Sequence, residues 1–97
     1  GRIRLIECKT TPITLKDVSQ LLGYSRVVLP VYACILSPLG VSDVASLLKT
    51  YSRLDVLEYN WPKGELPHSI VVATWNEQRK GIDYDSLIHA GHPLHQR

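Results

Sequence analysis

The 97-residue sequence contains no methionine, no phenylalanine and only two cysteines, and its charges nearly balance. Eleven Lys and Arg residues against nine Asp and Glu residues leave a net charge of +2. A charge this small gives no electrostatic reason to expect nucleic-acid or membrane binding. No apolar stretch reaches the roughly 18–20 residues needed to span a bilayer. We therefore expect one soluble, intracellular globular domain over residues 1–91, followed by a loose tail over 92–97.

The two cysteines, Cys8 and Cys34, each lie within an apolar stretch of the sequence. This placement predicts two small, reduced core residues, because free cysteine is often buried. A disulfide between neighbouring strands is the alternative in an oxidising compartment. The sequence has no CxxC pair, so neither a thioredoxin-type redox site nor a zinc ribbon is supported.

The first third of the chain predicts a strand followed by a helix. Arg2–Cys8 begins with an alternation of charged and apolar residues, which is typical of a half-buried strand. Thr14 and Asp17 have the spacing of a capping box, so a helix should start there. Gly23 should end that helix. Its apolar stripe would be formed by Leu15, Val18, Leu21 and Leu22.

The middle of the chain predicts a buried strand and a second helix. Val31–Ser37 is rich in apolar and β-branched residues and follows Pro30, which can only start or interrupt a strand. Ser42 should cap the second helix, with Asp43 near its positive end. The apolar face of that helix would be formed by Val44, Leu47, Leu48 and Tyr51.

The last part of the chain predicts two antiparallel strands and a short helix. Leu54–Trp61 and Ser69–Trp75 should form a hairpin around the loop Pro62–His68, which holds two prolines and a glycine. Asp83 should cap a final short helix over Tyr84–Ala90.

This order, β-α-β-α-β-β followed by a short helix, predicts a two-layer α/β sandwich. Two main helices would pack on a mixed sheet of about four strands, with the first two strands parallel and joined by a right-handed crossover. A ferredoxin-like arrangement is the alternative if Pro30 divides its apolar stretch into two strands.

The candidate contact surface lies on the predicted hairpin, because two helices can cover only one face of such a sheet. An exposed aromatic and aliphatic patch usually marks an interface. The leading hypothesis is therefore a non-catalytic protein-interaction or self-association domain, a structural or assembly component of a larger complex such as a viral matrix or capsid. The residues expected to contact the partner are Leu57, Tyr59, Trp61, Lys63 and Trp75.

Two other classes of function stay open. A nucleic-acid-binding accessory domain would use Arg2, Arg4, Lys63, Arg79 and Lys80, with binding that weakens with salt. A small metal-dependent enzyme would use His68, Asp83 and Asp85.

Metal and cofactor motifs are weak in this sequence. His89, His92 and His95 could offer three imidazoles to a metal ion, but Gly91 and Pro93 interrupt any helix that would align them. No glycine-rich phosphate-binding motif is present. We therefore expect neither a catalytic residue set nor a cofactor.

Overall fold

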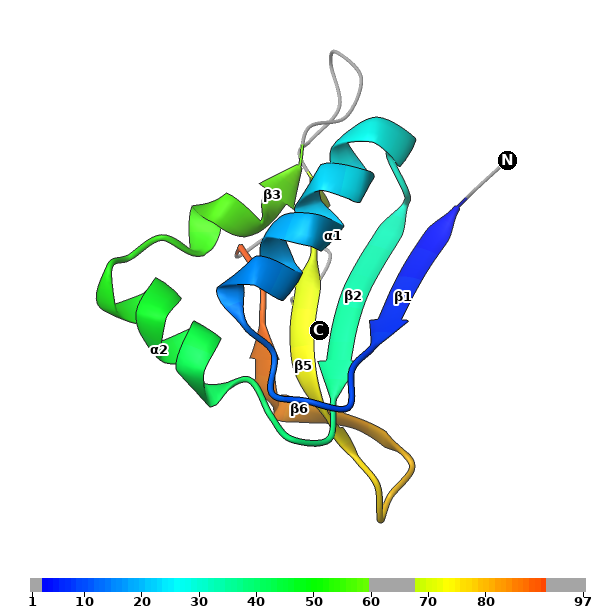
Figure 1. The fold of residues 1–97 in the computed structure, drawn as a ribbon, viewed down its shortest axis with the longest axis vertical. Coiled ribbons are helices and arrows are strands. Elements are labelled where there is room, and N and C mark those ends of the chain that lie inside the picture. Colours follow the sequence, from blue (N-terminus) through cyan, green and yellow to red (C-terminus); the bar gives the residue numbers. More distant parts are fainter. Residues whose placement is uncertain (1–2, 60–67, 91–97) are drawn as a thin grey trace.

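The computed structural model describes residues 3–59 and 68–90 as a mixed sheet with two helices packed on it (Figure 1). This confirms the predicted α/β class and its β-α-β-α-β-β order. Among the described residues, no helix is both long and apolar enough to cross a membrane. The elements are β1 (Arg4–Cys8), α1 (Leu15–Val28), β2 (Tyr32–Ser37), α2 (Ser42–Thr50), the 3-10 helix η1 (Leu54–Leu57), β3 (Glu58–Tyr59), β4 (His68–Ser69), β5 (Val71–Asn76) and β6 (Gly81–Ile88).

The main sheet has the strand order β1-β2-β5-β6. β1, β2 and β5 are parallel, as predicted for the first two strands, and β6 is antiparallel to β5. The predicted hairpin is wrong in extent, because within the described residues β3 and β4 share a ladder of only two residues. β5 instead lies beside β2, since its fully buried run Val71–Ala73 requires a position inside the sheet.

Helix α1 begins where the sequence predicts but continues past its predicted end. The Thr14 amide donates to Asp17 Oδ2 at 2.9 Å, and the Asp17 amide donates to Thr14 Oγ1 at 3.3 Å, which completes the capping box. Gly23 does not stop the helix, which reaches Val28 and ends at Leu29 in the left-handed conformation. Pro30 prevents further continuation. Because the residues before Pro30 are helical, the ferredoxin-like alternative is wrong.

Three local predictions in the rest of the chain are corrected by the structure. Val41 rather than Ser42 occupies the N-cap of α2, and no side chain caps it. The predicted strand Leu54–Trp61 begins as η1 and becomes extended only at Glu58. The predicted helix Tyr84–Ala90 does not form, because residues 84–88 belong to strand β6 and its pairing with β5 outweighs the local helical pattern.

Two apolar clusters lie on opposite faces of the sheet. The larger one joins the inner sides of α1 and α2 to residues such as Ile35 and Val72, since both helices lie in front of the sheet (Figure 1). The smaller one, on the other face, has Cys34 and Leu36 at its centre. Cys34 is buried as predicted, whereas Cys8 is exposed, and both thiols are free.

Candidate interaction surface

Among the described residues of the predicted hairpin surface, Leu57 and Tyr59 are buried rather than exposed. Leu57 and Tyr59 are 0% and 1% exposed and belong to the helix-side core. The Tyr59 hydroxyl also donates a buried hydrogen bond to the Pro30 carbonyl at 2.9 Å. Trp75 packs in the cluster on the opposite face of the sheet. Because Leu57 and Tyr59 are enclosed, they cannot be the exposed face expected of them; Trp61 and Lys63 lie outside the described residues.

The predicted nucleic-acid residues do not share one surface among the described part of the chain. Arg4 is exposed at the first residue of β1. Arg79 and Lys80 are exposed in the β5–β6 turn, at the opposite end of the sheet from Arg4 (Figure 1). Lys80 Nζ also lies 3.5 Å from Glu77 Oε1. Arg2 and Lys63 lie outside the described residues.

The candidate enzyme residues are also separated. His68 lies in β4, with its ring centroid 5.8 Å from that of Tyr59. Asp83 is paired with Thr74, six residues further along an extended segment, which corresponds to about 20 Å. The described residues contain no group of three or more His, Cys, Asp or Glu side chains placed to hold a metal ion. His89 is described, whereas His92 and His95 fall outside the described ranges.

Asp83 and Asp85 instead shape a bulge in β6. Asp83 Oδ1 accepts the Asp85 amide at 3.1 Å, which makes a local turn. The Ser86 hydroxyl donates to the Asp83 carbonyl at 2.7 Å and accepts the Thr74 amide at 2.8 Å. A side chain thus takes the place of a strand carbonyl opposite Thr74, and this edge of the sheet is irregular.

The other edge strand, β1, is regular and has a sheet neighbour on one side only within the described residues. The Ile3 carbonyl accepts the Val31 amide and the Lys9 amide donates to the Leu36 carbonyl, both at 2.8 Å. Residues 3, 5, 7 and 9 therefore direct their backbone groups toward β2. Because these directions alternate along a strand, Arg4, Ile6 and Cys8 direct theirs outward.

Exposed apolar side chains flank this open edge. Ile3 and Ile6 on β1 are 47% and 59% exposed, and Tyr24 and Val28 on α1 are 64% and 39% exposed. Between the strand and the helix runs a groove of about 290 Å³ lined by Leu5, Ile6, Glu7, Leu21, Tyr24 and Val28. We name the outward side of β1, this groove and the exposed residues Ile3, Ile6, Tyr24 and Val28 the edge surface.

An ion pair fixes the end of β1 against the start of α1. Lys9 Nζ lies 3.1 Å from Asp17 Oδ1, across the junction between the strand and the helix. The Thr14 amide, followed by Lys9, lowers the pKa of Asp17, although partial burial opposes the shift. The ionised carboxylate therefore both caps the helix and holds it beside the edge strand.

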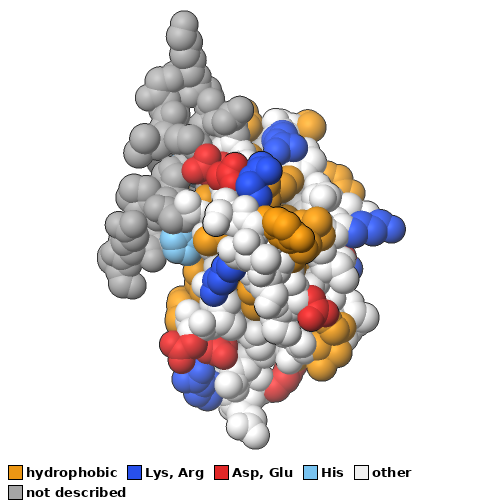
Figure 2. All heavy atoms as spheres, turned by 90° about the vertical axis from the view of Figure 1, so that its left-hand side faces the viewer, with side chains coloured by type: hydrophobic (Ala, Val, Ile, Leu, Met, Phe, Trp, Pro, Cys, Tyr) orange, Lys and Arg blue, Asp and Glu red, His pale blue; other side chains and the backbone are white. Residues whose placement is uncertain are grey.

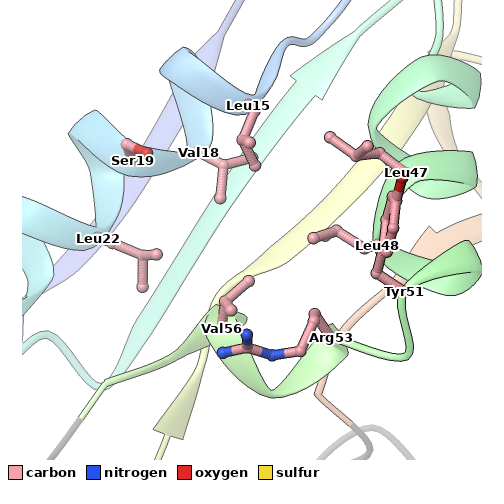
Figure 3. A pocket seen from close by; sticks show the side chains of 9 residues that line it. All are labelled: Leu15, Val18, Ser19, Leu22, Leu47, Leu48, Tyr51, Arg53 and Val56. Carbon is pink, nitrogen blue, oxygen red and sulfur yellow. The ribbon is translucent and has the colours of Figure 1, made fainter.

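A second groove, of about 330 Å³, lies between α1, α2 and η1 (Figure 3). Leu22 faces it from α1 and Leu48 from α2, while Arg53 reaches across its lower end toward Val56. The Arg53 guanidinium is held by Asp55, with Nε 3.0 Å from Oδ1. This groove has no open strand beside it. On the side of the molecule that carries α2, hydrophobic side chains lie in separate groups among polar and charged ones (Figure 2).

Sequence reasoning missed the edge surface because it ended α1 at Gly23. Tyr24 and Val28 then fall between the predicted helix and the predicted strand Val31–Ser37, and their alignment with Leu21 on one side of a helix is lost. The signal that could have found them is the spacing of Leu21, Tyr24 and Val28, at three and four residues.

Comparison with known proteins does not assign the chain to a family. It matches no family model, no curated protein and no solved structure.

Proposed function

We propose that this is a non-catalytic protein-interaction domain that binds its partner through the edge surface. It would act as an assembly component of a larger complex. The observation that carries the proposal is the coincidence of an open, regular strand edge with exposed apolar side chains on both the strand and the neighbouring helix.

Backbone and side-chain features of the edge surface support the same mode of binding. A strand edge offers unpaired amide and carbonyl groups to an incoming strand, and such strand addition is a recurrent mode of protein recognition. The groove beside β1 supplies apolar contact through Leu21, Tyr24 and Val28. Backbone pairing gives affinity in this mode, and the groove adds selectivity.

The experiment uses site-specific photo-crosslinking at three exposed tyrosines. Tyr24, Tyr51 and Tyr84 are 64%, 68% and 73% exposed, so each can be replaced singly by p-benzoylphenylalanine with little effect on packing. Tyr24 is on the edge surface, whereas Tyr51 follows α2 and Tyr84 is in the β6 bulge. The proteins are irradiated in the cells that produce them, and adducts are identified by mass spectrometry.

We expect a discrete protein adduct at position 24 and none, or far less, at positions 51 and 84. Equal adduct formation at all three positions, or none at position 24, would contradict the proposal. The mass of the adduct also reports whether the partner is another protein or the chain itself.

A further inference from the structure

Building on the proposed function, we propose that the partner at the edge surface is a second copy of this chain. The two β1 strands would pair antiparallel around a two-fold axis that passes beside Ile6, joining two four-stranded sheets into one of eight strands. The argument rests on the backbone directions of β1, on its charges and on the position of α1.

The backbone of β1 is suited to pairing with itself. Arg4, Ile6 and Cys8 direct their amides and carbonyls outward, and Ile6 is the middle residue of the strand. In an antiparallel pair, residues that exchange both hydrogen bonds lie directly opposite each other. With Ile6 opposite Ile6 of the second copy, Arg4 lies opposite Cys8 and all five residues of β1 overlap.

The charges of β1 disfavour two other registers, and a third, centred on Leu5, pairs only residues 4–6 of β1 with each other. Ile6 opposite Ile6 puts Leu5 opposite Glu7, so no like charges face each other. A shift that centres the pair on Glu7 would place two carboxylates directly opposite, and one that centres it on Arg4 would place two guanidinium groups there. Like charges directly opposite on paired strands are destabilising.

The position of α1 favours a whole second copy over an isolated peptide strand. A two-fold axis perpendicular to the sheet keeps both α1 helices on the same face. Since α1 packs against β2, the strand next to β1 (Figure 1), the two helices would be about three strand spacings apart, about 14 Å. A helix with its side chains is about 10–12 Å across, so residues as large as Tyr24 can close the gap.

A second copy therefore covers both parts of the edge surface at once. Its β1 pairs with the open backbone, and its Tyr24 and Val28 face the same residues of the first copy across the two grooves. A lone strand would satisfy the backbone but would leave the outer side of Tyr24, which is 64% exposed, in water. The same apolar patch of each copy thus contacts its counterpart, as in an isologous interface.

The test is a charge exchange at the two-fold axis. Ile6→Lys and Ile6→Glu each place two like charges opposite each other in the dimer and remove two apolar side chains from the interface. The self-association of either variant alone should be at least about a hundredfold weaker than that of the wild type. An equimolar mixture of the two variants should dimerise again, because each lysine then faces a glutamate.

Sedimentation over a dilution series measures these states against the mass of one chain, 10.9 kDa. Matched controls are Leu47→Lys and Leu47→Glu, at an exposed leucine of α2 far from β1, and these should dimerise like the wild type. Circular dichroism of each dilute variant checks that it is folded. Recovery in the mixture is itself evidence that both variants fold.

Two results would overturn the inference. A wild type that is monomeric at every concentration removes the second copy as partner. If Ile6→Glu alone dimerises as well as the wild type or better, residue 6 faces Arg4 and the axis is not at Ile6. The first result leaves the proposed function standing if the crosslink at position 24 joins another protein; the absence of any such crosslink removes the proposed function itself.

Discussion

The two outer strands of the main sheet, β1 and β6, differ in regularity. β1 pairs with β2 in an unbroken register of five residues. In β6, by contrast, Ile88 pairs with Val72 and Asp83 pairs with Thr74. The chain therefore takes five residue steps in β6 where β5 takes two. The extra residues form the bulge in which Ser86 replaces a strand carbonyl and Tyr84 points into solvent, 73% exposed.

This difference indicates which edge can accept another strand. Bulges and charged residues are the usual ways in which proteins prevent unwanted pairing at a sheet edge. β6 has both, with Asp83 and Asp85 in the bulge, whereas β1 carries the charged Arg4 and Glu7 but has an unbroken register with Ile6 at its centre. The contrast between a blocked edge and an open one favours β1 as the binding edge.

The largest expected effect separates the edge strand from its buried neighbour. Ile35 in β2 is 0% exposed, so Ile35→Ala should lower the free energy of unfolding by about 2–5 kcal/mol. Ile6→Ala should change it by less than about 0.5 kcal/mol, since Ile6 is 59% exposed. Urea unfolding measures both free-energy changes, at a protein concentration low enough that any dimer is dissociated. Equal losses would show that β1 is not an open edge.

The next effect concerns the bulge that blocks the other edge. Ser86→Ala removes the acceptor of the Thr74 amide and should cost about 1–3 kcal/mol. Amide hydrogen exchange at Thr74 should become faster in the variant. The matched control is Ser46→Ala, on the exposed side of α2, which should change stability by less than about 0.5 kcal/mol. Unchanged exchange at Thr74 would contradict the role assigned to Ser86.

The smallest effect tests how α1 is fixed beside β1. Because the pKa of Asp17 is lower in the folded state than the unfolded value of about 3.9, its ionisation stabilises the fold above that value. This stabilisation should be lost as the pH falls through the folded pKa. At pH 7, Asp17→Asn should cost about 1 kcal/mol. Urea midpoints of wild type and variant should converge toward pH 2; a constant difference down to that pH would contradict this assignment.

The sequence predicted the fold class because its strongest signals are local. Thr14 and Asp17 are three residues apart, so the start of α1 depends on hydrogen bonds within one turn. The buried strand after Pro30 was predicted from its unbroken apolar composition. The candidate site was not predictable in the same way, since Leu57 and Tyr59 look equally suited to an exposed face and to a core.

The errors occur where distant contacts outweigh a local pattern. Gly23 costs a helix about 1 kcal/mol, yet α1 continues through it to Val28, and the Leu29 amide closes the helix on the Ser25 carbonyl at 2.9 Å. Asp83 has the composition of a helix cap, yet its carboxylate makes a turn inside a strand because β5 supplies a pairing partner.

The sequence by itself determined the start of α1, the buried strand β2, the parallel pairing of β1 with β2 and the α/β class, because these follow from hydrogen bonds and periodicities within a few residues. Only the tertiary structure decided the strand order, the burial of Leu57 and Tyr59, and the difference between an open edge at β1 and a bulged one at β6. Those features depend on which segments, far apart in the chain, pack together and exclude water. Several segments compete for each position, and the outcome is determined only when the whole sheet is assembled.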